Sequence, residues 1–170
     1  MNKIQKHSRT IRIIGQFVFW ATIAWAIIFP LLMMLPSNPD TQFSLNGTEF
    51  DLQSMDTGNK VTLSLIAVLA SLVLAYGAYH FYKLFGLYEK GIIFAKENVQ
   101  HISAIGKALI LWFFAGILID LGKITLSEFV KGPTGINLDL SSLLIGATIF
   151  LFARVMDEGR KLREEQELIV

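Results

Sequence analysis

The 170-residue sequence contains no cysteine and few charged residues, and both features narrow what the protein can be. Without cysteine there is no disulfide, no thiolate metal site and no thiol nucleophile. Only 17% of the residues are charged and 53% are apolar, which is too apolar a composition for a soluble domain of this length. The formal net charge of +1 indicates little, so the positions of the charges carry the information.

Catalytic and cofactor motifs are also missing. There is no His-Glu-x-x-His pair, no Gly-x-Ser-x-Gly motif and no phosphate-binding loop. His7, His80 and His101 stand at no ligand spacing from another histidine or a carboxylate, so solvated or interfacial histidines are favoured over a metal cluster. We therefore expect a protein that is not an enzyme and that has no catalytic residue, cofactor or metal.

The sequence does contain four long apolar segments separated by polar ones, the hydropathy pattern of membrane spans. The predicted spans cover residues 13–35, 61–82, 102–121 and 139–156. The first is interpreted as a span and not as a cleaved signal peptide, because its apolar stretch is too long and no small-x-small cleavage site follows. These segments predict an all-α integral membrane protein of one domain, folded as an antiparallel four-helix bundle.

Basic residues predict the orientation of the spans. Twelve of the 15 lie in the N-terminal segment, in the loop of residues 83–101 with the adjoining Lys107, or from Arg154 at the end of the fourth span onward. The remaining loops contain only Lys60, Lys123 and Lys131. Because positive residues stay on the cytoplasmic side, both termini are expected in the cytoplasm of a bacterium, with the chain in its plasma (inner) membrane.

The first outer loop has the pattern of a small β-hairpin over residues 42–52. Asn46-Gly47 between two short alternating segments is typical of a two-residue type I′ turn, and it sets Phe43 opposite Phe50. An isolated hairpin is only marginally stable in water, so we expect its apolar face to pack on the outer mouth of the bundle. The glycosylation sequon Asn46-Gly47-Thr48 is the second interpretation of these residues.

Two helices are expected to extend beyond the membrane on the cytoplasmic side. The second helix continues past Tyr82 until Gly91 ends it, Phe94 plugs the turn, and a new helix begins near Lys96. The fourth helix continues as a cytoplasmic helical tail, residues 157–170, because acidic and basic residues recur four apart in it. Asn137 is a candidate N-cap for that helix.

Two features inside the spans bear on packing and function. Ser64, Ala67, Ser71 and Ala75 form a small-residue stripe that lets helices approach closely, either within the bundle or in a homodimer. Asp120 is an ionisable residue near membrane depth and is therefore a candidate intramembrane polar site. It is expected to face the bundle interior, Lys123 or water at the outer mouth; the alternative is a simple charge at a helix end.

Two cytoplasmic segments carry a family resemblance. The segment from Phe85 to Phe94 with Asn98-Val99, and the ending from Ala153 to Leu162 with Glu165–Val170, resemble the domain-of-unknown-function 2975 family of small bacterial four-helix inner-membrane proteins. The family usually closes on Leu-Thr-Val, where this chain has Leu168-Ile169-Val170. The resemblance implies no activity or ligand, but many members are encoded beside a short helix-turn-helix regulator.

These observations predict a regulatory or binding protein that presents a cytoplasmic surface to a protein partner such as a helix-turn-helix regulator. Partners would then be the lipid bilayer, that regulator and a second copy of the chain, with no direct nucleic-acid binding. The alternative is a small-molecule sensor or transporter component that uses the bundle interior near Asp120. The candidate partner surface comprises Tyr88, Glu89, Gly91, Phe94, Asn98, Arg154, Gly159, Arg160, Leu162, Glu165, Leu168 and Val170.

Overall fold

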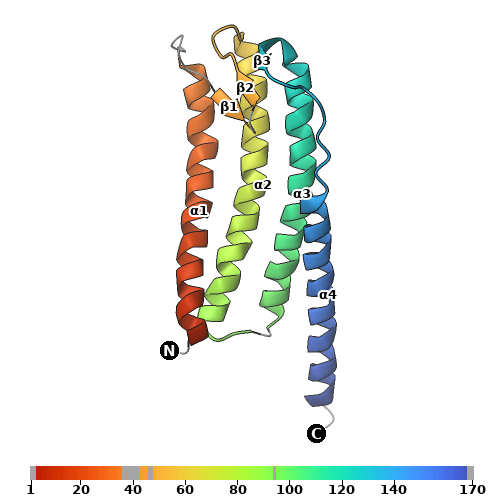
Figure 1. The fold of residues 1–170 in the computed structure, drawn as a ribbon. Helices are drawn as coiled ribbons and strands as arrows, with labels where there is room; N and C mark the ends of the chain where they lie inside the picture. Colours follow the sequence, from red (N-terminus) through yellow and green to blue (C-terminus); the bar gives the residue numbers. More distant parts are fainter. Residues whose placement is uncertain (1–2, 36–42, 46–47, 94, 168–170) are drawn as a thin grey trace.

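Four helices and a small sheet make up the computed structural model, which describes residues 3–35, 43–45, 48–93 and 95–167 (Figure 1). The first three helices are α1 (Lys3–Met34), α2 (Thr57–Glu89) and α3 (Lys96–Thr125). All three are long and apolar enough to cross a membrane. Large apolar side chains such as Phe17, Leu31 and Leu65 are exposed on their surfaces, as expected where lipid is the solvent. The chain is a membrane protein.

The fourth helix, α4 (Ser141–Glu167), differs from the other three. It begins beside the middle of α3 and extends beyond the ends of α1, α2 and α3 (Figure 1). Its apolar part, from Ser141 to Ala153, is about 20 Å long at ~1.5 Å per residue, short of a hydrocarbon core of ~30 Å. Among the described residues α4 is therefore not one of the helices apolar enough to span, and the prediction of four spans is not confirmed.

The start of α4 also corrects its predicted cap. Asp139 Oδ1 accepts a hydrogen bond from the backbone N–H of Ser141 at 3.0 Å, and it also bonds the Ser141 hydroxyl. Asn137 does not cap the helix, because α4 begins four residues further on, at Ser141. The backbone N–H of Asn137 donates to Asp120 Oδ2 at 2.8 Å. Residues 132–140 form an exposed connection that runs alongside α3 before α4 begins (Figure 1).

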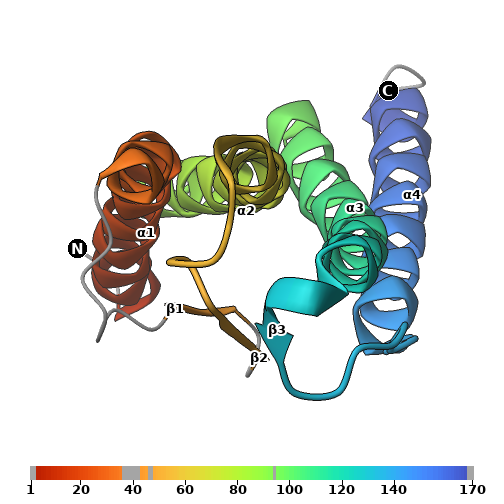
Figure 2. The ribbon, with the colours of Figure 1, turned by 90° about the horizontal axis from the view of Figure 1, so that it is seen from above.

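Successive helices pack antiparallel in a curved row in chain order, with α1 and α4 at opposite ends (Figure 2). The expected bundle is therefore open, and α2 and α3 each have a helix on both sides. All four residues of the small-residue stripe of α2 are buried, as its packing role predicts. Glycines allow close contacts between neighbouring helices. Between α1 and α2, a Cβ on Gly15 would lie 3.1 Å from Tyr82 Cβ, and between α2 and α3, one on Gly77 would lie 3.2 Å from Ala108 Cβ.

The closest approach joins α3 to α4. A Cβ on Gly106 would lie 2.8 Å from the backbone nitrogen of Phe150, and one on Gly146 would lie 2.8 Å from the Gly106 carbonyl oxygen. Because the neighbouring atoms are backbone, they cannot rotate away from an added side chain. These two glycines therefore let the helix backbones touch, as small residues do at helix contacts in lipid.

A three-stranded antiparallel sheet lies at the end of the row where α1 ends and α2 begins (Figure 1). The predicted hairpin is confirmed in its register: β1 (Phe43–Leu45) and β2 (Thr48–Phe50) pair Phe43 with Phe50. Its turn, Asn46-Gly47, lies outside the described residues. The unpredicted strand β3 (Val130–Lys131) follows a short 3-10 helix (Ser127–Phe129) and pairs with β2.

The hairpin covers an apolar core at this end of the helices, as predicted. Phe50 is 2% exposed and packs in a cluster drawn from α1, α2, β2, the connection from β2 to α2, and the residue that follows α3. The members of this cluster are Phe29, Met33, Phe50, Leu52, Met55, Leu63, Ala67 and Leu126. We call this the sheet end, and the opposite end, with the α2–α3 turn and most of the basic residues, the basic end.

Candidate binding surfaces

The α2–α3 turn at the basic end is held by a closed hydrogen-bond pattern. Gly91 donates its N–H to the Tyr88 carbonyl at 3.0 Å, and Ile92 donates to the Leu87 carbonyl at 3.0 Å, which is the Schellman ending of a helix. Gly91 has φ of +79°, a conformation that favours glycine. The predicted stop at Gly91 and restart at Lys96 are both confirmed. Phe94, predicted to plug the turn, lies outside the described residues.

Asn98 locks this turn from inside. Its side chain is 0% exposed, accepts a hydrogen bond from the Ala95 N–H at 3.3 Å and donates to the Ile92 carbonyl at 3.0 Å. Tyr88 packs beside it, against the cluster that contains Leu84 and Val99. Tyr88, Gly91 and Asn98 were predicted as one partner surface; the structure brings them together, but as the internal scaffold of the turn.

Glu89 ties this scaffold to the first helix. Its carboxylate lies 2.9 Å from Arg12 Nε and 4.0 Å from Arg9 Nε, both on α1. The closer pair is partly shielded from solvent, which makes it stronger than a fully exposed ion pair. Of the predicted surface residues near the turn, Glu89 is therefore engaged within the chain.

Toward its C-terminal end, α4 carries a charged face. Arg160 bonds Asp157 at 3.0 Å and also Glu164, while Lys161 Nζ lies 3.3 Å from Asp157. The hydrogen bond from Arg160, followed by that from Lys161, holds the pKa of Asp157 below its ordinary value. Two of the predicted pairs four residues apart are thus confirmed. Glu165 is exposed, and Arg154 lies over the ring of Phe150, 5.3 Å from its centroid.

A second face of α4 is apolar and uncovered among the described residues. Val155 is 63% exposed and Leu162 is 56% exposed, and Phe152 is exposed on the same side. A Cβ on Gly159 would meet nothing within 4 Å. These four residues recur at spacings of three and four, so they share one side of the helix, and we call them the α4 stripe. Leu168 and Val170 lie outside the described residues.

Two histidines meet across α2 and α3, which was not predicted. His80 Nδ1 lies 2.9 Å from His101 Nδ1, so one ring donates a hydrogen bond to the other. The contact could not be predicted because the two histidines are 21 positions apart on different helices, and their spacing in the sequence does not show that they meet. No third ligand-type side chain joins them in a group that could hold a metal within the described part of the chain.

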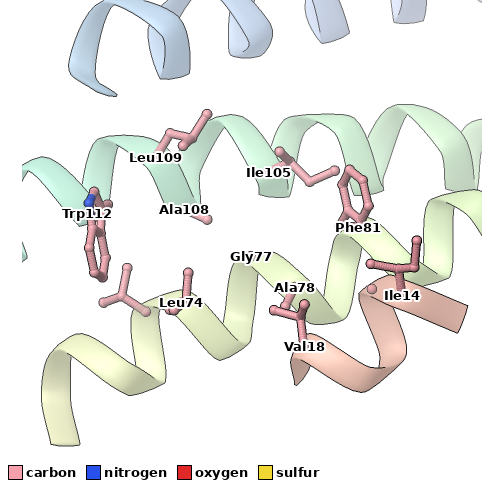
Figure 3. A pocket seen from close by; sticks show the side chains of 12 residues that line it. Ile14, Val18, Leu74, Gly77, Ala78, Phe81, Ile105, Ala108, Leu109 and Trp112 are labelled. Atoms are coloured by element: carbon pink, nitrogen blue, oxygen red, sulfur yellow. The ribbon is translucent and has the colours of Figure 1, made fainter. Parts of the chain in front are cut away.

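The concave side of the helix row contains an apolar groove. One cavity of about 360 Å³ lies between α1, α2 and α3, with Phe81, Leu109 and Trp112 in its wall (Figure 3). A second, of about 410 Å³, continues toward the sheet end and shares Val18, Leu74 and Trp112 with the first. Both volumes lie in the range of ~300–1,000 Å³ that is typical of small-molecule sites.

Asp120 does not line either cavity. It is 6% exposed, receives a hydrogen bond from Lys123 Nζ at 3.1 Å and, as described above, accepts from the Asn137 N–H. Of the three surroundings predicted for Asp120, the structure shows Lys123. The ion pair closes the sheet end of α3 and holds the connection to α4 in place.

Comparison with known proteins gives one match. The family model described as protein of unknown function (DUF2975) matches residues 51–170. The match begins directly after β2 and includes α2, α3 and α4. No curated protein and no solved structure matches the chain. The two segments that carry the resemblance to this family both lie inside the matched region.

Proposed function

We propose a function for this chain from the fact that it belongs to the DUF2975 family of proteins of unknown function. In this proposal it is a non-enzymatic binding protein of the bacterial inner membrane. Its task in this proposal is to hold a cytosolic protein partner on the basic end of the helices. Both termini lie at that end (Figure 1), and the excess of basic residues there supports a cytoplasmic location.

The observation that carries the proposal is the α4 stripe on a helix that extends past the rest of the structure (Figure 1). Leu162 exposes apolar surface past the predicted fourth span, where no lipid is expected to cover it, and Val155 is exposed in the last turn of that span. Each would gain about 1.5–3 kcal/mol by complete burial. Gly159 between them leaves room for another backbone to approach. An apolar line at spacings of three and four on one helix is the surface that a second helix recognises.

The predicted surface residues of the α2–α3 turn are not part of the α4 stripe, but they stabilise the region from which α4 extends. Tyr88, Gly91 and Asn98 fix the conformation of the α2–α3 turn. Gly106 and Gly146 let α4 pack closely against α3. The part of α4 that extends past the other helices therefore starts from a well-packed region. A rigid support reduces the ordering cost of binding. The helix-turn-helix regulator encoded beside many family members is the partner that we propose.

The test is co-purification of the neighbouring regulator with the membrane protein in mild detergent. We expect the regulator to bind the wild-type chain, but not the chain truncated after Glu158 or the double variant Val155→Gln/Leu162→Gln. The matched control is Lys161→Gln/Glu164→Gln, which changes two charged residues of the same helix outside the stripe and should bind normally. Equal binding to all four chains, or to none, contradicts the proposal.

A second candidate function is small-molecule sensing or transport, and the apolar groove favours it. Its ligand would be apolar, because the cavity in Figure 3 is lined by aliphatic and aromatic side chains and by glycine. Asp120 is less suited to this function, since it is engaged by Lys123 and by the Asn137 backbone. Leu74 is half-exposed and lines both cavities, so Leu74→Trp should fill the groove and abolish such binding. The double variant Asp120→Asn/Lys123→Met, which removes the ion pair without leaving a buried charge, should leave the ligand affinity unchanged.

A further inference from the structure

A third cavity lies on a different side of α2 from the apolar groove. Its volume is about 460 Å³, and α1, α2 and α3 all contribute to its lining: Arg12, Gln16, Tyr82, Lys83, Gly86, Leu87, Lys90 and His101. The groove uses Leu74, Gly77 and Phe81 of α2, and Lys83 is two positions past Phe81, about 200° around a helix of 3.6 residues per turn. We call this third cavity the basic pocket.

The charge around the basic pocket is unbalanced. Arg12, Lys83 and Lys90 line it, and no carboxylate does. Glu89, the adjacent acid, already pairs with Arg12. Within the described residues no carboxylate lies in ion-pair distance of Lys83 or Lys90, so two positive charges at the cavity remain without a negative partner. Positive charges that line the same cavity repel, and an anion in the cavity would relieve that repulsion.

Neutral hydrogen-bond donors complete the lining. Gln16 offers an amide, Tyr82 a hydroxyl and His101 an imidazole. Because His101 Nδ1 is engaged by His80, the proton of a neutral His101 lies on Nε2 whenever His80 is the donor. Gly86 adds no side chain to the cavity wall, and the Arg12 side chain lies beside it: a Cβ on Gly86 would be 3.4 Å from Arg12 Cδ. Cationic and neutral donors around one cavity match the acceptor oxygens of a phosphate.

The position of the pocket indicates where the phosphate comes from. Lys83 lies over the rings of Tyr79 and Tyr82, 5.6 and 5.8 Å from their centroids. Tyrosine and lysine together are typical of the headgroup level of a membrane, and basic pockets between helices on the cytoplasmic side bind anionic headgroups. We propose that the basic pocket binds a phosphate group, supplied by an anionic phospholipid of the inner leaflet.

The test uses native mass spectrometry of the full chain with added phosphatidylglycerol or phosphatidylcholine of the same acyl chains. We expect wild type to retain phosphatidylglycerol preferentially and Lys83→Gln/Lys90→Gln to lose it by about tenfold or more. The control Lys96→Gln/Lys107→Gln removes the same charge from another cavity at the same end of the molecule, and it should retain the lipid.

A parallel arm separates the two sources of phosphate. Inorganic phosphate is titrated against the detergent-purified chain while the unfolding temperature is followed. A rise that depends on Lys83 and Lys90, without preference for phosphatidylglycerol, supports the pocket but assigns it to free phosphate. No preference and no rise, or equal losses in both double variants, would overturn the proposal. Since helix content of exposed lysine variants is expected to be unchanged, circular dichroism checks that each variant is folded.

Discussion

At each end of the helix row, one buried polar side chain holds a connection between helices by hydrogen bonds. At the basic end, the amide of Asn98 bonds two backbone groups, the Ala95 N–H and the Ile92 carbonyl, so its role depends on having both a donor and an acceptor. At the sheet end, the carboxylate of Asp120 serves a buried lysine and a backbone N–H. Both side chains are buried, and a buried polar group that loses its partner is costly.

Replacing Asn98 tests the lock at the basic end. Asn98→Ala should destabilise the fold by roughly 2–4 kcal/mol, because it leaves the Ile92 carbonyl and the Ala95 N–H without their partner. Hydrogen exchange should rise first at the α2–α3 turn and only later in the helix centres. Gln100→Ala, an exposed change on the same helix, is the control and should leave both readouts unchanged.

Replacing Asp120 tests the clasp at the sheet end. Asp120→Asn leaves Lys123 buried without its counter-charge, which should cost about 3–5 kcal/mol in unfolding free energy. The double variant Asp120→Asn/Lys123→Met removes both charges and should recover most of that loss. If the single and double variants are equally unstable in denaturant titrations, the ion pair is not what holds this end.

At the scale of elements, glycines decide how closely the helices pack. Gly15, Gly77, Gly106 and Gly146 each stand where two helices meet, whereas Gly159 faces open space. The stripe of Ser64, Ala67, Ser71 and Ala75 was visible in the sequence because its members recur along one helix. The glycine contacts were not, because each joins residues on two helices whose relative register the sequence does not state.

A pair of matched substitutions tests this difference. Gly146→Ala places a methyl group against the α3 backbone and should destabilise the α3–α4 contact by about 1–3 kcal/mol. Gly159→Ala meets nothing and replaces a poor helix former by a good one, so it should stabilise α4 by up to about 1 kcal/mol. Unfolding followed by circular dichroism distinguishes them; the same sign for both changes would contradict the assigned contact.

Local signals in the sequence were sufficient for elements that depend on neighbouring residues. The stop at Gly91 follows from its left-handed backbone, and the hairpin register follows from Asn46-Gly47. Strand β3 is only two residues long and has no periodicity of its own, so its pairing with β2 could not be seen. The His80–His101 contact and the basic pocket likewise require the helices to be placed before their residues meet.

For the whole molecule, the departure of α4 from the other helices matters most. Composition and charge predicted a membrane protein with its basic residues at one end, and the structure has that form. What the apolar segments did not reveal is that the fourth helix starts beside the middle of α3 (Figure 1), and within the described residues it is not among the helices apolar enough to span a membrane. Its apolar stripe therefore continues beyond the other helices, which is the basis of the proposed function.

The absence of cysteine makes a direct test of the stripe available, because a single introduced thiol is unique in the chain. Leu162→Cys places it in the stripe, and Lys161→Cys places it next door on the charged side. A thiol-reactive crosslinker of short reach is applied to cells that also contain the helix-turn-helix regulator proposed as the partner. The yield of the crosslink to this regulator should be at least about tenfold higher for Leu162→Cys than for Lys161→Cys. Equal yields at the two positions, or an adduct that contains only a second copy of this chain, would contradict the claim that α4 holds that partner.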